Sequence, residues 1–370
     1  MRVLIDGTTL LLRSAGVKNY VYHWIGALRK LAGREAIGVF PFIGDIGDLS
    51  HEKSPVGLFG TLPRIGWVLF SNIRFNPLLS LTIFRPDVFH ASLHVANPPR
   101  SVALTGTLHD FTCSLMPETH TAGNVKATIR YAERLKKRAR RVIAVSAQTK
   151  SDAVRLMGFD PDRIDVIHHG VDDAYRNVTA DDVARVRAVY GLTKPYILFV
   201  GTIEPRKNVD LLLDAYSQLR PSMRDEYDLA VVGPRGWSSE STIARLAGGL
   251  RGVRYLGYVP ELDLPGVTAG AAVFLYPSLY EGFGFPVAQA MAAGVPVITS
   301  NLSSLPEIAG DAAVLIDPRS LSEMTGSIER VLLGPSFARD LSARGRARAA
   351  HFTWERCAAD SLAFFERATG

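Results

Sequence analysis

The chain has 370 residues, of which 47% are hydrophobic and 21% are charged. This length exceeds the comfortable size of one hydrophobic core and predicts two domains, and the composition excludes a disordered or fibrous chain. The net charge is +6, and its excess lies in residues 1–176, which hold 23 Lys and Arg against 15 Asp and Glu. A basic run at 130–146 is expected to be a solvated helix face, because aromatic residues and nucleic-acid motifs are nearly absent there, so no nucleic-acid partner is expected.

Strand-like apolar runs separated by helical periodicity begin at the N-terminus, which predicts an α/β first domain. The runs are RVLID (2–6), IGVFPF (37–42), DVFHA (87–91), VALTGTL (102–108), RVIAVS (141–146) and IDVIHH (164–169).

A polar stretch at 170–182 interrupts this pattern, and we place the domain boundary there, with a first domain over 1–176 and a second over 177–352. The alternation then resumes, which predicts a second parallel sheet with crossover helices. Its strands are expected in PYILFVG (195–201), DLAVVG (228–233), VRYLG (253–257), VFLYPS (273–278), VPVITS (295–300) and AVLIDP (313–318). The last helical segment, about 353–370, is a candidate to pack back on the first domain.

Two cysteines, Cys113 and Cys357, stand far apart and form no CxxC or Cys/His cluster, so neither a disulfide framework nor a zinc site is indicated. The start MRVLIDG reaches an acid at Asp6 and lacks the apolar core of a signal peptide, and no run is long enough to span a bilayer. These features favour a cytoplasmic location.

Two glycine-rich turns carry the charged residues that favour a phosphorylated ligand. In YEGFGFP, Glu281 precedes Gly282 and Gly284, and a helix is expected to begin near Phe285 with its partially positive end at the turn. In GTIEPRKN (201–208), a similar turn carries Arg206 and Lys207. Two adjacent cations and two helix starts suit a diphosphate, although each side chain also has an ordinary role as a surface charge or helix cap.

Taken in order, these and further motifs resemble the family 4 glycosyltransferases, which are retaining, nucleotide-sugar-dependent enzymes of the GT-B fold. The resemblance covers nearly the whole chain. It implies two Rossmann-like, doubly wound domains that face each other across a cleft, the first binding the acceptor and the second the donor. The motifs are GVKNYV (16–21), TLHDF (107–111), VSAQTKSD (145–152), HHGVD (168–172), GTIEPRKN (201–208), GYV (257–259) and EGFGFPVAQAMAAGVPVI (281–298).

The resemblance also implies roles for individual residues. Glu281 would bond hydroxyls of the transferred sugar, His109 would lie near its anomeric carbon, and Arg206 and Lys207 would bind the diphosphate. Taken alone, His109 is better explained as a structural residue at a strand end than as a catalytic one. The remaining donor-binding residues would be Gly16, Gly257, Tyr258, Val259, Gly282, Phe283, Gly284 and Gln289.

Gln289 departs from the family pattern, which has a second glutamate eight residues after the first. That glutamate is expected to accept hydrogen bonds from two ribose hydroxyls, whereas an amide offers one acceptor oxygen. We expect weaker ribose binding, since charge-assisted hydrogen bonds are about twice as strong as neutral ones.

Asp160 and Asp162 spell a DxD motif of the kind that binds a divalent metal in another glycosyltransferase fold, but they lie in MGFDPDRIDVI, where aspartate and proline are ordinary turn formers. No metal and no organic cofactor are expected. The serine-hydrolase elbow, the P-loop lysine and HExxH are all absent from the sequence.

The leading hypothesis is a hexosyltransferase that moves mannose from GDP-mannose onto a saccharide or lipid-linked saccharide in bacterial surface-polysaccharide synthesis. Two alternatives stay open: a GT-B-fold epimerase or phosphorylase, and a non-catalytic partner subunit that binds nucleotide sugar.

Residues 56–84 mix aromatic and apolar side chains with Arg64 and Arg74. Burial explains this segment, and so does peripheral contact with an anionic membrane.

Overall fold

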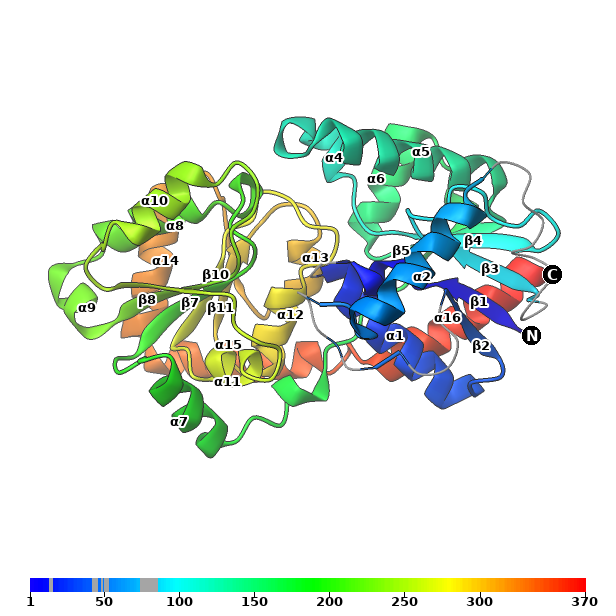
Figure 1. The fold of residues 1–370 in the computed structure, drawn as a ribbon. Helices are drawn as coiled ribbons and strands as arrows, with labels where there is room; N and C mark the ends of the chain where they lie inside the picture. Colours follow the sequence, from blue (N-terminus) through cyan, green and yellow to red (C-terminus); the bar gives the residue numbers. More distant parts are fainter. Residues whose placement is uncertain (13–15, 42–45, 48, 50–52, 74–85) are drawn as a thin grey trace. The chain divides into compact units, whose positions relative to one another are not determined.

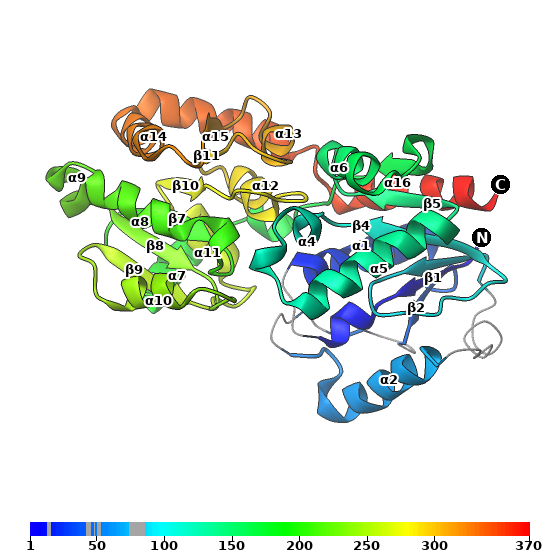
Figure 2. The ribbon, with the colours of Figure 1, turned by 90° about the horizontal axis from the view of Figure 1, so that it is seen from above.

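The computed structural model describes residues 1–12, 16–41, 46–47, 49, 53–73 and 86–370. It divides into two compact units. Unit 1 comprises Met1–Pro117, Thr121–Gly170 and Thr353–Gly370, and unit 2 comprises Glu118–His120 and Val171–Phe352. Each unit contains a six-stranded parallel sheet with helices packed on its faces, as Figures 1 and 2 show from two directions. The predicted α/β class with two doubly wound sheets is confirmed.

The central strands of both sheets are almost entirely buried, because crossover helices cover parallel sheets on both sides, whereas edge strands such as residues 253–257 are partly exposed. The apolar runs of the sequence therefore coincide with the observed strands, and the core lies between each sheet and its helices. Val3, Ile5, Val88 and Phe89 in unit 1 are at most 1% exposed, and Ile197–Phe199 in unit 2 are fully buried.

In unit 1 the strand order is β2-β1-β3-β4-β5-β6, so the chain leaves β1 in one direction and returns to its other side at β3. The strands are β1 (Val3–Asp6), β2 (Ile37–Phe40), β3 (Val88–Ala91), β4 (Ala103–Leu108), β5 (Arg141–Ala144) and β6 (Ile164–Val166). The helices are η1 (Thr8–Leu11), α1 (Gly16–Ala32), α2 (Gly57–Ser71), α4 (Thr112–Leu115), α5 (Ala122–Arg138), α6 (Ala147–Met157), η3 (Pro161–Arg163) and α16 (Trp354–Thr369). The short helix η2 (Pro117–Thr119) falls mostly within Glu118–His120, which belong to unit 2.

In unit 2 the order is β12-β11-β10-β7-β8-β9, with β7 and β10 side by side although about 75 residues separate them. The strands are β7 (Tyr196–Val200), β8 (Asp228–Val232), β9 (Val253–Gly257), β10 (Val273–Tyr276), β11 (Val297–Ser300) and β12 (Val314–Ile316). The helices are η4 (Asp173–Tyr175), α7 (Ala180–Val189), η5 (Pro205–Lys207), α8 (Val209–Gln218), α9 (Pro221–Glu226), α10 (Glu240–Ala247), α11 (Leu264–Ala269), α12 (Phe285–Ala292), α13 (Leu305–Ala309), α14 (Leu321–Leu333) and α15 (Pro335–Ala349).

The C-terminal helix α16 packs within unit 1, against α1. Trp24 Nε1 on α1 donates a hydrogen bond to Ser361 Oγ on α16 at 2.9 Å, and the Trp24 ring contacts Phe365. The chain changes unit after Gly170 and again after Phe352. The first change comes earlier in the chain than the boundary predicted after residue 176, because the helix η4 packs with α11 and α12 of unit 2.

The two cysteines, Cys113 and Cys357, are buried and free. None of the helices in the described ranges is long and apolar enough to cross a membrane. Residues 74–84 of the segment predicted to contact a membrane lie outside the described residues, and α2 lies within them.

Candidate active site

The two charged motifs of unit 2 follow neighbouring strands at the point where the strand order reverses. From β7 the chain proceeds outward to β8 and β9, and it then returns to β10 on the other side of β7. The loops after β7 and β10 therefore leave the sheet in opposite directions, which opens the usual ligand site of a doubly wound sheet. Arg206 and Lys207 follow β7, and Glu281 follows β10.

The Glu281 carboxylate is the centre of the resulting charge cluster. Its Oε1 accepts hydrogen bonds from Lys207 Nζ at 2.5 Å, Ser278 Oγ at 2.6 Å and Tyr276 OH at 3.0 Å, and Arg206 Nη1 lies 2.8 Å away. The side chain is buried, which by itself raises the pKa of the carboxyl, but the two adjacent cations outweigh burial and set this pKa at about 2. Glu281 is therefore ionised at every pH at which the protein would be assayed.

The Lys207 ammonium keeps one donor for a ligand. It is 8% exposed and donates to Tyr276 OH at 2.6 Å and to Glu281 Oε1. Burial and the neighbouring Arg206 lower its pKa, and Glu281 opposes that shift. An ammonium has three donors, and the described residues accept two of them. The third can serve a phosphate oxygen without breaking either bond.

The Arg206 guanidinium contacts the carboxylates of Glu204 and Glu281 and a backbone carbonyl in the turn after β10. Its Nη1 donates to Tyr280 O at 2.5 Å, and its Nη2 donates to Glu204 Oε1 at 2.6 Å. With Lys207 and Glu281, these residues form a four-charge cluster of two cations and two carboxylates that sums to zero. The two cations lie in the 3-10 turn η5 before the helix α8, and the carboxylates of Glu204 and Glu281 balance their charge.

The glycine turn that follows Glu281 is held by two serines from the loop after β11. Glu281 N donates to Ser303 Oγ at 2.9 Å, and Ser304 Oγ lies 2.9 and 3.0 Å from the carbonyl oxygens of Glu281 and Phe283. Gly284 has φ +101°, and a Cβ there would lie 2.6 Å from Leu305 Cδ2. Only glycine fits this position, and α12 begins directly afterwards at Phe285, as predicted.

Except for Gly16, the remaining predicted donor-binding residues lie in unit 2 but are spread along it. Gly282 and Phe283 are buried in the turn itself, and Gln289 is half-buried in the second turn of α12. Gly257 ends the edge strand β9, two strands beyond β7, and Tyr258 and Val259 follow it. With strands about 4.8 Å apart, they lie roughly 14 Å along the sheet from the end of β10. The structure therefore brings Arg206, Lys207 and Glu281 together and places 257–259 at a distance.

Unit 1 places Gly16 and His109 on neighbouring elements. Gly16 is exposed at the first position of α1, and residues 13–15 before it lie outside the described residues. Tyr20, one turn further along α1, has its ring 5.2 Å from the His109 ring and 4.4 Å from the His169 ring. Asp110, next to His109, accepts hydrogen bonds from Thr112 N and Oγ1 and so begins α4.

Two histidines of unit 1, the buried His90 and the half-buried His109, give a testable pH dependence. Burial lowers the pKa of His109 to about 4 and of His90 to about 3, below the ordinary 6.5, with the neighbouring His109 adding to the effect at His90. Below pH 6.5 the unfolded chain binds protons that the folded one does not, so stability is retained above that pH and lost as the pH falls. We expect the free energy of unfolding to drop by about 2 kcal/mol per histidine between pH 7 and 5.

Denaturant unfolding at the two pH values measures this drop. His90→Gln should reduce the pH dependence, because the glutamine does not titrate, while the same change at the exposed His351 should leave it unaltered. An unfolding free energy that is the same at pH 5 and 7 would contradict the neutral state of these rings.

The DxD-like aspartates have a structural role. Asp160 accepts a hydrogen bond from Asp162 N at 3.0 Å and caps η3, in agreement with the turn interpretation. Across the described ranges of the chain, no group of three or more His, Cys, Asp or Glu side chains is placed to hold a metal ion.

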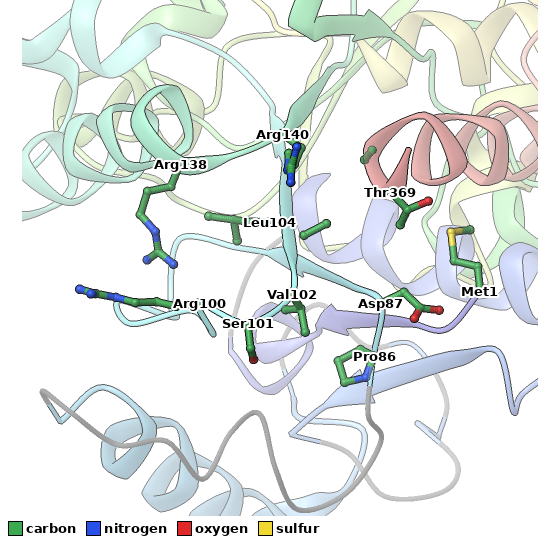
Figure 3. Close-up of a pocket in the computed structure, with 12 residues that line it drawn as sticks. Met1, Pro86, Asp87, Arg100, Ser101, Val102, Leu104, Arg138, Arg140 and Thr369 are labelled. Carbon is green, nitrogen blue, oxygen red and sulfur yellow. The ribbon is translucent and has the colours of Figure 1, made fainter.

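A pocket of about 890 Å³ lies on unit 1 at the opposite end of its sheet, where β3, β4 and β5 begin. Figure 3 shows Arg100 and Arg138 on one side of it and Asp87 and Thr369 on the other. None of the predicted site residues lines this pocket.

Several partners of the charge cluster are not apparent from the sequence motifs. Tyr276 and Ser278 come from the end of β10, and Ser303 and Ser304 from the loop after β11. Glu204 lies inside the GTIEPRKN motif, two residues before Arg206, and its charge was the available signal. Their roles depend on which strands are neighbours, and a single sequence does not give that order.

Comparisons with known proteins agree with this architecture. Residues 14–175 match the family described as "Glycosyltransferase Family 4", and residues 183–348 match "Glycosyl transferases group 1". Among solved structures, sucrose-phosphate synthase from Thermosynechococcus elongatus superposes with a TM-score of 0.74 at 20% identity, covering 99% of each chain. HepE from Anabaena, solved with UDP and glucose, gives 0.71 at 19% identity and covers 98% of this chain and 99% of its own. The fold is GT-B.

Sequence relatives define the family. O-antigen chain mannosyltransferase B of Escherichia coli is 36% identical over 268 residues, which are 72% of this chain and 70% of that protein. The serotype-specific mannosyltransferase WbdA of Escherichia coli is 28% identical over 236 residues, which are 62% of this chain but only 29% of WbdA. The chain belongs to the family 4 glycosyltransferases.

Proposed function

We propose that this glycosyltransferase moves mannose from GDP-mannose to a saccharide or lipid-linked saccharide acceptor with retention of configuration, and that it acts in the cytoplasm in the synthesis of a surface polysaccharide. The charge cluster around Glu281 carries the proposal, because it lies at the switch point of unit 2 and Lys207 keeps a donor for a diphosphate. Two relatives are named as an O-antigen chain mannosyltransferase and a serotype-specific mannosyltransferase, which favours mannose.

In this proposal unit 2 binds the donor and unit 1 the acceptor. Negative charge grows on the diphosphate as the glycosidic bond breaks, so Lys207 and Arg206 stabilise the transition state more than the ground state. The departing phosphate oxygen takes the proton of the acceptor hydroxyl. In this scheme Lys207 and Arg206 supply the hydrogen-bond donors to the diphosphate in place of a divalent metal.

A transfer assay tests the proposal directly. The purified protein is incubated with GDP-mannose and an O-antigen mannooligosaccharide acceptor, with and without EDTA, and the product is examined by NMR. The proposal predicts an α-linked mannose, formed at the same rate in EDTA. Release of an altered sugar without acceptor would instead support an epimerase, and phosphorolysis of the oligosaccharide would support a phosphorylase. Binding of GDP-mannose without turnover would support the non-catalytic subunit.

We also propose peripheral contact of unit 1 with an anionic membrane through α2. This helix exposes Leu58, Phe59, Leu62 and Leu69, and Phe59 is 92% exposed. Residues 58, 62 and 69 of α2 lie at helical spacing, so this apolar surface is one face of the helix. Such a face, on the more basic half of the chain, is typical of helices that lie in the membrane interface.

Cosedimentation with vesicles measures this contact. At low salt we expect binding to vesicles with 40% phosphatidylserine and little binding to neutral ones, and we expect Phe59→Ser/Leu62→Ser to reduce it about tenfold or more, since two large apolar side chains are lost. Leu262→Ser, at an 83% exposed leucine of unit 2, is the matched control. Equal binding of the double variant and the wild type would reject α2 as the contact.

A further inference from the structure

Glu204 has a fixed position beside the charge cluster. The residue before it, Ile203, extends the pairing of β7 and β8: Ile203 N donates to Pro234 O at 3.0 Å, and Gly236 N donates to Ile203 O at 3.0 Å. The Glu204 backbone is extended, with φ −146° and ψ 156°, and the residue is 4% exposed. Backbone pairing at the ends of β7 and β8 therefore fixes the position from which the Glu204 side chain extends.

Only one of the two carboxylate oxygens of Glu204 accepts a hydrogen bond from the described residues. Oε1 accepts from Arg206 Nη2 at 2.6 Å, while Oε2 is buried and has no hydrogen-bond partner in the described part of the chain. A buried charged oxygen without a donor is costly, and such atoms in native proteins usually mark a position where a ligand or water completes the bonding. By contrast, Glu281 Oε1 accepts three hydrogen bonds and lies 2.8 Å from Arg206 Nη1.

The chemistry of the missing partner follows from the charge of Glu204. A carboxylate repels a phosphate group and accepts a hydrogen bond from a hydroxyl. Arg206 connects Glu204 to Glu281 through its two terminal nitrogens, at 2.6 and 2.8 Å, so both carboxylates border one guanidinium group. A nucleotide sugar bound at this cluster brings hydroxyl groups on its ribose and on its transferred sugar.

We propose that Glu204 is a specificity-determining residue whose Oε2 accepts a hydrogen bond from a hydroxyl group of the bound nucleotide sugar. The proposal rests on the proposed function, because it requires that the cluster binds such a donor. It also gives the site a second carboxylate for hydroxyl recognition besides Glu281, in a chain that carries the neutral Gln289 where its family pattern has glutamate.

The test compares three probes on the wild type and on Glu204→Gln: GDP-mannose, GDP and 2′,3′-dideoxy-GDP. Glutamine keeps the volume and one acceptor for Arg206, but it places an NH₂ group or a neutral oxygen where Oε2 lies. Affinities are measured by isothermal titration calorimetry. A charge-assisted hydrogen bond to a hydroxyl predicts a loss of about tenfold or more.

The pattern of losses identifies the hydroxyl. A loss for GDP-mannose alone supports the proposal and assigns the partner to the mannosyl group. An equal loss for GDP-mannose and GDP that disappears with the dideoxy analogue supports it with a ribose hydroxyl. An equal loss for all three probes shows that Glu204 acts only through Arg206 on the phosphates, and this result overturns the proposal, as does no loss at all.

Two controls keep these results separate from folding and from the donor assignment. Glu329→Gln removes another ion-paired glutamate of unit 2, which lies 3.1 Å from Arg220, and it should change no affinity. The melting temperature of Glu204→Gln confirms that the variant is folded. If the wild type binds GDP but not GDP-mannose, the proposed donor is wrong, and the same comparison with GDP-glucose in its place then decides the role of Glu204.

Discussion

Lys207→Met is expected to lower kcat for sugar transfer by about 10²- to 10³-fold in a protein that remains folded. Lys207 is the cation with a donor left for a phosphate oxygen, so its loss removes charge stabilisation as the diphosphate departs. The fold should survive, because Glu281 keeps Arg206 at 2.8 Å and the hydroxyls of Ser278 and Tyr276 as partners.

Steady-state rates with GDP-mannose and an oligosaccharide acceptor measure the effect, and circular dichroism checks the fold. The matched control is Lys194→Met, which removes a half-exposed lysine that lies 3.7 Å from Asp228 in the same unit, and it should retain nearly full activity. Wild-type turnover by Lys207→Met would mean that the donor diphosphate binds elsewhere.

Glu281→Gln is expected to destabilise unit 2 by about 3–5 kcal/mol, because it leaves two buried cations with Glu204 as their remaining counterion. For a domain of this size that corresponds to a fall in melting temperature of roughly 10 °C. Scanning calorimetry on the purified variant gives the value. The surface variant Glu240→Gln, which breaks an exposed pair with Arg235, should cost at most about 1 kcal/mol.

The double variant Lys207→Met/Glu281→Gln separates charge from packing. It removes one cation together with the carboxylate and leaves Arg206 paired with Glu204. If the uncompensated charge causes the instability, the double variant should be more stable than Glu281→Gln alone. A double variant that loses the sum of the two single effects would show that these side chains do not interact energetically.

Much of the fold was predictable because buried parallel strands leave a strong signal in the sequence. Each predicted run, from RVLID to AVLIDP, contains an observed strand, since the central strands are covered on both faces and few polar residues interrupt the runs. The start of α12 at Phe285 was equally legible, because Gly284 needs a positive φ that few other residues adopt. Both are local properties.

The contacts within the site could not be predicted in the same way, because they join residues that are far apart in the sequence. Lys207 and Glu281 are 74 residues apart, and their contact depends on β7 and β10 being neighbours. The sequence also suggested that a bound diphosphate balances the charge of Arg206 and Lys207, whereas the structure pairs these cations with Glu204 and Glu281. Periodicity carries no information on strand order, so the partners Tyr276 and Ser278 and the unmatched oxygen of Glu204 emerged only from the structure.

The claim that this charge cluster binds the donor diphosphate is tested most directly by calorimetric titration of GDP and guanosine into the wild type and Lys207→Met. The two ligands differ only in the diphosphate. We predict that the wild type binds GDP at least about tenfold more tightly than guanosine, and that Lys207→Met loses most of this difference while binding guanosine as before. Equal affinities of the wild type for GDP and guanosine, or an undiminished preference for GDP in Lys207→Met, would contradict the assignment.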